Sequence, residues 1–232
     1  MAHPSIVILT GAGISAESGL GTFRDEGGLW AQHRIEDVAT PEGFARNPKL
    51  VVDFYNTRRA QAQDATPNAA HVALARLQAE HQGDVMLVTQ NVDALHEKAG
   101  SQDVIHMHGQ LDSALCSNCE HLWTAPIAMR VGETCPSCGA GTARPDIVWF
   151  GEIPYHMDRI EAALGRADIF AAIGTSGNVY PAAGFVQLAT HVGAKTVEMN
   201  LDPSETVAQF DETRPGKASQ TVPEWVEHVL GN

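Results

Sequence analysis

The chain is poor in basic residues, in cysteines and in long apolar segments. Its 232 residues carry 15 Lys and Arg against 28 Asp and Glu, a formal net charge of −13. This balance argues against non-specific binding to nucleic acid or to an anionic membrane surface. No apolar run approaches the roughly 20 residues of a membrane-spanning helix, and the start, MAHPSIVILTGAG, lacks signal-peptide features. We expect a cytoplasmic protein with no membrane partner and no specific nucleic-acid partner.

The four cysteines form two C-x-x-C pairs separated by fifteen residues, so none is left for a disulfide framework and a reducing compartment is indicated. Four thiolates close a tetrahedral zinc site and leave no position for a reacting water. We predict a structural zinc that holds an insertion without a core of its own, with the ligands Cys116, Cys119, Cys135 and Cys138. A redox pair and a nucleic-acid-binding ribbon are the alternatives, and the few basic residues over 117–140 count against the ribbon.

The stretch Ser5–Arg24 (SIVILTGAGISAESGLGTFR) has the pattern of a buried strand, a glycine turn and the start of a helix. Such glycines let backbone N–H groups approach a pyrophosphate, which the positive end of a helix also attracts. An ordinary strand–turn–helix corner is the alternative for so short a motif. A dehydrogenase would also carry an acidic residue after its second strand, but the sequence about 20 residues on is DEGGLWAQHR, with no strand before it. The corner thus favours dinucleotide binding of another kind.

Polar or small residues follow four further predicted strands, Val85–Thr89, Val104–Met107, Ile169–Ile173 and Lys195–Met199. Because the carboxyl ends of parallel strands meet at one edge of a sheet, these groups should line one crevice. They are Gln90, Asn91 and Asp93; His108; Gly174, Thr175 and Ser176; and Asn200, Leu201 and Asp202. His108 ends a strand before a glycine and is the best candidate for a general base. Asn91 or Asp93 could instead cap the next helix.

The region between the first two strands is predicted to be helical. Within it, Pro48–Ala62 has the pattern of an amphipathic helix on which Tyr55 and Arg58 share a face. The two side chains could clamp a carboxylate, although most such pairs lie on a solvated helix face. Further helices are expected over 68–81, 157–165, 182–191 and 222–230, and an edge strand over 147–150 could offer backbone groups to a peptide.

These segments predict an α/β fold, a doubly wound, Rossmann-like parallel sheet with a smaller second domain. We assign residues 1–31, 76–112 and 144–232 to the sheet domain. The small domain would consist of a helical module, residues 32–75, and a zinc module, residues 113–143.

Seven motifs in this order resemble those of the sirtuins, which are NAD-dependent protein-lysine deacylases: GAGISAESGLGTFR, TQNVD, IHMHG, the paired C-x-x-C, VWFGE, GTS and NLD. The resemblance runs over Ile6–Leu230, and the chain looks like a bacterial catalytic core. Ala39, Tyr55 and Arg58 resemble the subclass that removes succinyl and malonyl groups. The resemblance implies a monomer that deacylates protein lysines, acetyl-lysine included, consumes NAD, releases nicotinamide and O-acyl-ADP-ribose, and holds one zinc.

The resemblance also implies roles for single residues. It makes His108 the general base, with Asn91 as a second catalytic residue, and it places the acyl group against Ala39, Tyr55 and Arg58. The acyl-lysine and its backbone would bind as an added strand to Val148, Phe150 and Gly151. The NAD-binding residues would be Gly11, Ala12, Gly13, Ser15, Phe23, Arg24, Trp30, Gln90, Asn91, Asp93, Gly174, Thr175, Ser176, Asn200, Leu201, Asp202 and Ala218.

Two alternatives come from other functional classes. A nicotinamide-dependent oxidoreductase would change the absorbance of the reduced cofactor. A zinc-ribbon interaction module would bind partners without consuming NAD. Release of nicotinamide that requires an acylated peptide distinguishes the three.

Overall fold

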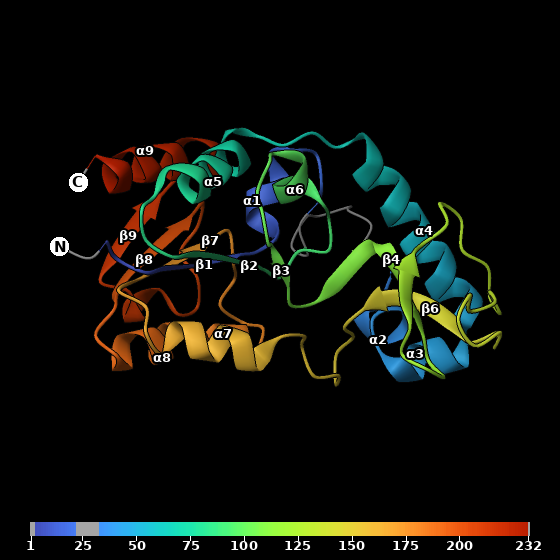
Figure 1. The fold of residues 1–232 in the computed structure, drawn as a ribbon. Coiled ribbons are helices and arrows are strands. Elements are labelled where there is room, and N and C mark those ends of the chain that lie inside the picture. The colour runs from blue at the N-terminus through green and yellow to red at the C-terminus, as the bar shows by residue number, and fades with distance from the viewer. Residues whose placement is uncertain (1–2, 22–32, 232) are drawn as a thin grey trace.

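The computed structural model describes residues 3–21 and 33–231, so the predicted NAD-binding residues Phe23, Arg24 and Trp30 lie outside the described residues. At its centre is a parallel six-stranded sheet with the strand order β3-β2-β1-β7-β8-β9 (Figure 1). Its strands are β1 (Ile6–Thr10), β2 (Val85–Thr89), β3 (Ile105–His106), β7 (Ile169–Ile173), β8 (Lys195–Asn200) and β9 (Glu212–Pro215). The predicted α/β fold with a parallel sheet is confirmed.

Helices cover both faces of this sheet, which explains why every residue of β1 is buried. Alternate residues of β1 point to opposite faces: Ile6 and Ile8 pack with α5 (Ala69–Glu80) and α9 (Ala218–Leu230). On the other face, Val7 and Leu9 pack with α7 (Met157–Leu164) and α8 (Phe185–His191), as Figure 1 shows. Short elements complete this part: α1 (Ala12–Ala16), α6 (Leu95–Lys98), η2 (Ala182–Gly184) and η3 (Val207–Gln209).

A second, antiparallel sheet has the order β5-β4-β6 and lies at one end of the molecule with three helices (Figure 1). The strands are β4 (Gly109–Cys116), β5 (Leu122–Thr124) and β6 (Ala143–Ile147), and the helices are α2 (Ile35–Val38), α3 (Pro41–Arg46) and α4 (Pro48–Asp64). Thr40 and Asn47 begin α3 and α4 because their side-chain oxygens accept backbone N–H groups, each followed by proline in the first turn. Val51 and Phe54 of α4 pack in one core with Leu111 of β4.

The structure corrects some predicted boundaries. The edge strand predicted over 147–150 is wrong, because β6 ends at Ile147 and the next residues bind loops of two different elements. Val148 N donates to the carbonyl of His108, and Phe150 N donates to the carbonyl of Ala39, each over 2.9 Å. The predicted helix over 182–191 is divided into η2 and α8, and the C-terminal helix begins at Ala218 instead of Val222.

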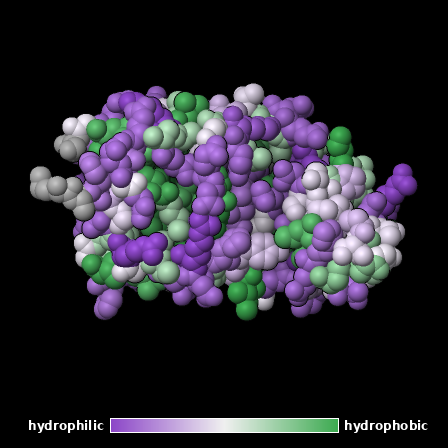
Figure 2. All heavy atoms as spheres, viewed as in Figure 1, coloured by the Kyte–Doolittle hydropathy of each residue, from purple (hydrophilic) through white to green (hydrophobic). Residues whose placement is uncertain are grey.

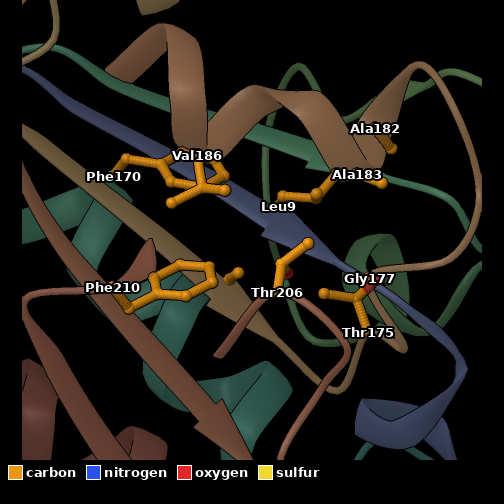
Figure 3. A pocket seen from close by; sticks show the side chains of 10 residues that line it. Leu9, Phe170, Thr175, Gly177, Ala182, Ala183, Val186, Thr206 and Phe210 are labelled. Carbon is orange, nitrogen blue, oxygen red and sulfur yellow. The ribbon is translucent and has the colours of Figure 1, made fainter. Parts of the chain in front are cut away.

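The visible surface is mainly hydrophilic, with hydrophobic residues in small scattered groups (Figure 2). Among the described residues, no helix is both long and apolar enough to cross a membrane. Beneath the end of β7, a cavity of about 10 Å³ lies between Phe170, Val186 and Phe210, whose side chains face one another in Figure 3. It holds at most one water molecule and is too small for a ligand.

The corner after β1 and the corner after β7 touch backbone to backbone. Gly13 N donates to the carbonyl of Gly174 over 2.8 Å. A Cβ on Gly13 would lie 2.7 Å from Gly174 Cα, and a Cβ on Gly11 would lie 2.7 Å from Gly174 O. Gly174 itself has φ +62, a conformation that favours glycine. The glycines of the predicted dinucleotide motif therefore also serve the packing of two strands.

This contact predicts that Gly13→Ala destabilises the protein by about 2 to 3 kcal/mol, because the clash is with backbone that cannot move aside. Urea denaturation measures the change. Gly184→Ala is the matched control, since its Cβ would meet only Tyr180 Cε1 at 3.9 Å. Equal stabilities of the Gly13 and Gly184 variants would contradict this account.

Candidate active site

The site begins where the loop after β2 meets the corner after β1. Asn91 donates both amide hydrogens, to Gly11 O and to Ser15 Oγ, each over 3.1 Å. Ser15 Oγ donates in turn to Asp93 Oδ2 over 3.1 Å. Asp93 Oδ1 accepts from Leu95 N, but the N-cap of α6 is Ala94 and no side chain caps this helix, so the alternative that Asn91 or Asp93 caps it is wrong. Because both amide hydrogens are taken, Asn91 can offer its Oδ1 to a ligand.

Asp93 is a buried acid whose charge has several partners. Asn91 and Asp93 are each only 8% exposed. Burial raises the pKa of Asp93, whereas the hydrogen bonds from Leu95 N–H and the Ser15 hydroxyl lower it. The positive charges of His106 and Arg58 act in the same direction as those bonds. A carboxylate held in this way can accept hydrogen bonds or attract a developing cation.

The ends of β2, β7 and β8 are joined by their own side chains. Gln90 Nε2 donates to Thr175 Oγ1 over 3.0 Å, and Asn200 Nδ2 donates to Thr175 O over 2.6 Å. Farther out, Leu201 and Asp202 are exposed, and Ser176 is half-buried beside Thr175. Ala218 is buried at the start of α9, where the Glu17 carboxylate accepts from Ser219 N and Oγ. The sequence predicts that residues after the strands meet at one edge of the sheet, and the structure brings Gln90, Thr175 and Asn200 together there.

His108 lies beyond β3 with its ring half-buried. Its Nδ1 is 3.2 Å from the carbonyl oxygen of Gln90. A carbonyl only accepts, so Nδ1 carries the hydrogen and Nε2 keeps its lone pair. Burial lowers the pKa of His108, which the Gln90 carbonyl partly offsets. The side chain is therefore a neutral imidazole at neutral pH, as a general base requires.

On its other side, the backbone of His108 is bound to the segment after β6. The His108 carbonyl accepts from Val148 N, and the Ala39 carbonyl accepts from Phe150 N. Between them, Trp149 Nε1 donates to the hydroxyl of Tyr55 over 3.2 Å. These bonds place the helical module next to the histidine, with Phe150 and Gly151 exposed.

Tyr55 and Arg58 are not on a solvated helix face. Tyr55 is 2% exposed, and burial raises its pKa to about 12. Arg58 is half-buried, and burial lowers the pKa of its guanidinium, which the charges of Tyr55 and Asp93 oppose. Arg58 is thus a partly desolvated cation within electrostatic reach of the Asp93 carboxylate.

Sequence reasoning missed the pair that holds the loop after β6. Arg144 and Glu152 form two parallel N–H···O bonds of 2.7 and 2.8 Å. The Arg144 guanidinium also lies 3.9 Å from the centre of the Trp149 ring, and Glu152 accepts from Trp149 N. No periodicity links residues eight apart in a strand and a loop, so the sequence held no signal for this pair.

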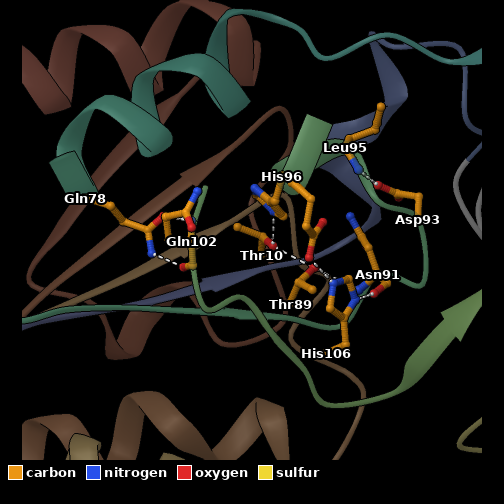
Figure 4. A network of polar contacts seen from close by, with 10 residues as sticks. Thr10, Gln78, Thr89, Asn91, Asp93, Leu95, His96, Gln102 and His106 are labelled. Carbon is orange, nitrogen blue, oxygen red and sulfur yellow. Dashed lines mark hydrogen bonds and ion pairs between the residues drawn. The ribbon is translucent and has the colours of Figure 1, made fainter. Parts of the chain in front are cut away.

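It also missed a buried polar layer below the crevice (Figure 4). Thr89 Oγ1 accepts from Asn91 N over 3.0 Å and from Thr10 Oγ1 over 2.8 Å. Thr10 Oγ1 lies 3.0 Å from His96 Nε2, and the His96 ring lies 5.0 Å from that of His71. Burial lowers the pKa of His71 to about 4 and that of His96 to about 3. Both histidines are therefore neutral at neutral pH.

The four cysteines meet between β4 and β6, and their Sγ atoms all lie within 4.8 Å of one another. The distances Cys116–Cys138 and Cys119–Cys135 are both 3.7 Å. A tetrahedron with zinc–sulfur bonds of about 2.3 Å has edges of about 3.8 Å. The cluster fits the structural zinc that the sequence predicts.

The fold and site define a class, a dinucleotide-binding α/β protein with an inserted four-thiolate metal module. The comparisons identify the family. The model described as "Sir2 family" matches residues 11–181. A protein of Caulobacter vibrioides named NAD-dependent protein deacylase is 55% identical over 229 residues, 97% of this chain and 96% of its own. This chain belongs to the Sir2 family, the sirtuins.

Two further similarities extend over the whole chain. A Vibrio parahaemolyticus protein, also named NAD-dependent protein deacylase, is 57% identical over 231 residues, 98% of this chain and 96% of its own. The solved structure of a Sir2 homolog–NAD complex has a TM-score of 0.90 and 39% identity, and covers 98% of this chain and 90% of its own.

Removing zinc should unfold the turns that carry the four cysteines without unfolding the main sheet, because the thiolates lose the ion that joins them. We expect a strong chelator to abolish amide-exchange protection in β5 and in these turns, while β1 and β7 keep theirs and β4 and β6 keep protection where Ala114 and Ala143 pack with Val52. Metal analysis before chelation should find one zinc per chain. Unchanged exchange in the chelated, zinc-free protein would show that the metal has no structural role.

Proposed function

We propose that this protein is an NAD-dependent protein deacylase that acts on acyl-lysine side chains. The observation that carries the proposal is the position of His108. Its neutral imidazole donates to the Gln90 carbonyl, and the Gln90 side chain donates to Thr175, which follows β7. The His108 carbonyl accepts from Val148 N, and Phe150 N, two residues further on, donates to Ala39 O of the helical module. We infer that this base lies between the residues assigned to NAD and those assigned to the acyl-lysine. The names of the similar proteins support this reading.

The residues fit NAD as a consumed substrate. Where the corners after β1 and β7 touch, the glycines carry no side chain that would hinder a pyrophosphate, although the N–H groups of Gly11, Gly13 and Gly174 are already bound within the chain. We assign Gly11, Ala12, Gly13 and Ser15 to the first corner of the NAD site, with Gly174, Thr175 and Ser176 at the phosphates. Asn200, Leu201 and Asp202 would hold the adenosine ribose, and Ala218 the adenine. Gln90, Asn91 and Asp93 would line the pocket for nicotinamide and its ribose.

The chemistry requires a base and a group that tolerates positive charge. As nicotinamide leaves, cationic character develops at the anomeric carbon, near which the buried Asp93 carboxylate is favourable. The acyl oxygen attacks that carbon. His108 Nε2 then accepts a proton from a ribose hydroxyl, whose oxygen attacks the acyl carbon. The lysine amine takes up a proton and leaves, and water adds to the acyl carbon and frees the original acyl oxygen as the hydroxyl of the anomeric carbon, which gives free lysine and O-acyl-ADP-ribose. The Gln90 carbonyl, bound at Nδ1, stabilises the imidazolium that forms.

The segment 148–151 is the proposed site of the acyl-lysine backbone. Its N–H groups at Val148, Trp149 and Phe150 are already bound within the chain. A peptide lying along this segment would therefore donate to the carbonyl groups of Val148 and Phe150 instead of accepting from the amides, since the Trp149 carbonyl already accepts from Glu152 N. Phe150 and Gly151 are exposed and can contact the incoming chain.

We further propose that acidic acyl groups such as succinyl and malonyl are substrates alongside acetyl. Arg58 is a partly desolvated guanidinium beside a buried tyrosine, and a carboxylate can take two parallel N–H bonds from it. Ala39, which is small and buried, faces the same loop through its bond to Phe150. A neutral acetyl group does not use this cation.

His108→Ala tests the main proposal. We expect NAD-dependent deacylation of an acetylated peptide to fall at least about 100-fold, since a general base contributes at least that much. The urea midpoint should stay close to that of the wild type because the ring is only half-buried. Turnover within a few-fold of wild type would refute the assignment of the base.

Arg58→Met tests the acyl preference. We expect kcat/KM for a succinylated peptide to fall about 10- to 100-fold through loss of charge-assisted hydrogen bonds, with a much smaller fall for the acetylated peptide. Lys49→Met removes an equal charge from the exposed start of the same helix and should change neither. Equal losses on both substrates in the Arg58 variant would refute carboxylate recognition by this residue.

A further inference from the structure

Two histidines of the IHMHG motif bind neighbouring carbonyl groups of the loop after β2, but their other ring nitrogens differ. His106 Nδ1 lies 3.2 Å from Asn91 O, just as His108 Nδ1 lies 3.2 Å from Gln90 O. His106 Nε2, however, lies 2.7 Å from Oε1 of Glu97. Figure 4 shows the His106 ring beside Asn91. The function proposed above uses His108 and leaves the His106–Glu97 pair without a role.

The geometry determines the protonation state of His106. A carbonyl oxygen and an ionised carboxylate are both acceptors, and a neutral imidazole has a single N–H. His106 can satisfy Asn91 and Glu97 together only as an imidazolium with two donors. The ring is 6% exposed, whereas the Glu97 side chain is 39% exposed, so water solvates the carboxylate end of the pair.

The groups around His106 agree with this charge. Burial alone would lower the pKa of His106, but the hydrogen bond and charge of Glu97, the Asn91 carbonyl and the Asp93 carboxylate outweigh it, and the pKa is raised. His96, on the same helix as Glu97, is neutral because burial lowers its pKa, and the charges of His71 and His106 lower it further. The pKa of His106 is thus raised, whereas that of His108, two residues away, is lowered.

The charged His106 ring acts on Asn91 through a hydrogen bond and on Asp93 through its charge. The backbone of Asn91 is held at both ends, by the Thr89 hydroxyl at its N–H and by His106 at its carbonyl. Its side chain is thereby directed at Gly11 and Ser15. The His106 charge also favours the ionised form of the buried Asp93. Loss of the imidazolium would turn the charge-assisted bond to the Asn91 carbonyl into a weaker neutral one and would remove a positive charge that favours the ionised form of Asp93.

We propose that Glu97 and His106 are positioning residues, an ion pair that holds the Asn91–Asp93 segment in the shape that binds the nicotinamide end of NAD. This inference rests on the proposed function, which assigns that segment to NAD. It predicts an effect on NAD binding that depends on pH. A purely structural pair would lower activity by the same factor at every pH.

Glu97→Gln keeps the size of the side chain and removes its charge, so the pKa of His106 falls. At pH 8 the ring is then neutral and keeps only an uncharged bond to Asn91, and we expect KM for NAD to rise about tenfold, or about 1.4 kcal/mol, because a charge-assisted hydrogen bond becomes a neutral one. KM for the acylated peptide and kcat should stay within twofold. Burial keeps the ring of the variant neutral at pH 6 as well, so its KM for NAD should stay raised there, whereas KM of the wild type should rise toward the variant's value at high pH, where its own His106 loses the proton.

Asp103→Asn is the matched control. It breaks the exposed ion pair between Asp103 and Arg159, three residues from His106, and removes the same charge from the same region. Asp103 has φ 50, a conformation that asparagine also tolerates. KM for NAD should be unchanged in this variant at both pH values. An unchanged KM for NAD in Glu97→Gln at pH 8, or a wild-type KM for NAD that does not rise at the pH where its His106 becomes neutral, overturns the proposal.

A second measurement is independent of activity. Nitrogen-15 NMR of the histidine rings, with His106→Gln to assign the signal, should show His106 with both ring nitrogens protonated at pH 7. In Glu97→Gln the ring should be neutral at pH 8. A neutral His106 in the wild type at pH 7 overturns the proposal.

Calorimetry with NAD separates this inference from the proposed function. If the wild type fails to deacylate any peptide, the proposed function has failed, and NAD binding still tests the pair. Binding of NAD to Glu97→Gln that is about tenfold weaker at pH 8 supports the positioning role. Equal binding by the two proteins contradicts it.

Discussion

The backbone contact between Gly13 and Gly174 is the constraint on which the rest of the site depends. It brings the corners after β1 and β7 together at the carboxyl edge of the sheet. The loop after β2 then binds the first corner through Asn91 and the second through Gln90. A side chain at either glycine would separate the corners and, with them, the residues assigned to NAD. The glycines assigned to NAD thus also serve the packing of the two corners.

Buried polar groups then decide the charge of each part of the site. His71 and His96 are neutral because they are buried, and His108 is neutral because burial lowers its pKa and the Gln90 carbonyl only partly offsets this effect. His106 carries a charge because a carboxylate faces it. The segment with the four cysteines joins β4 to β6, and Val148, just after β6, donates to the His108 carbonyl, so the cysteine cluster and the proposed base are connected through the backbone.

Much of the sheet and of the crevice could be predicted from the sequence. Short apolar runs followed by glycine or amide residues mark β2 and β7 to the residue, because a parallel strand is buried on both faces. The segment over 147–150 was predicted wrongly because its apolar pattern is that of a strand, while its partners are two separate loops. Contacts between distant elements, such as Trp149 with Tyr55 or Glu97 with His106, have no local pattern. Tyr55 and Arg58 share a predicted helix face, but their burial follows only from tertiary packing.

The central claim is that one imidazole joins loss of nicotinamide to removal of an acyl group in a single crevice. The most direct measurement is the yield of free nicotinamide from the purified protein incubated with NAD and an acylated peptide. The account predicts one nicotinamide for each peptide deacylated, and almost none when the peptide is unacylated. Nicotinamide release that ignores the acyl group, or deacylation that proceeds without NAD, would contradict it.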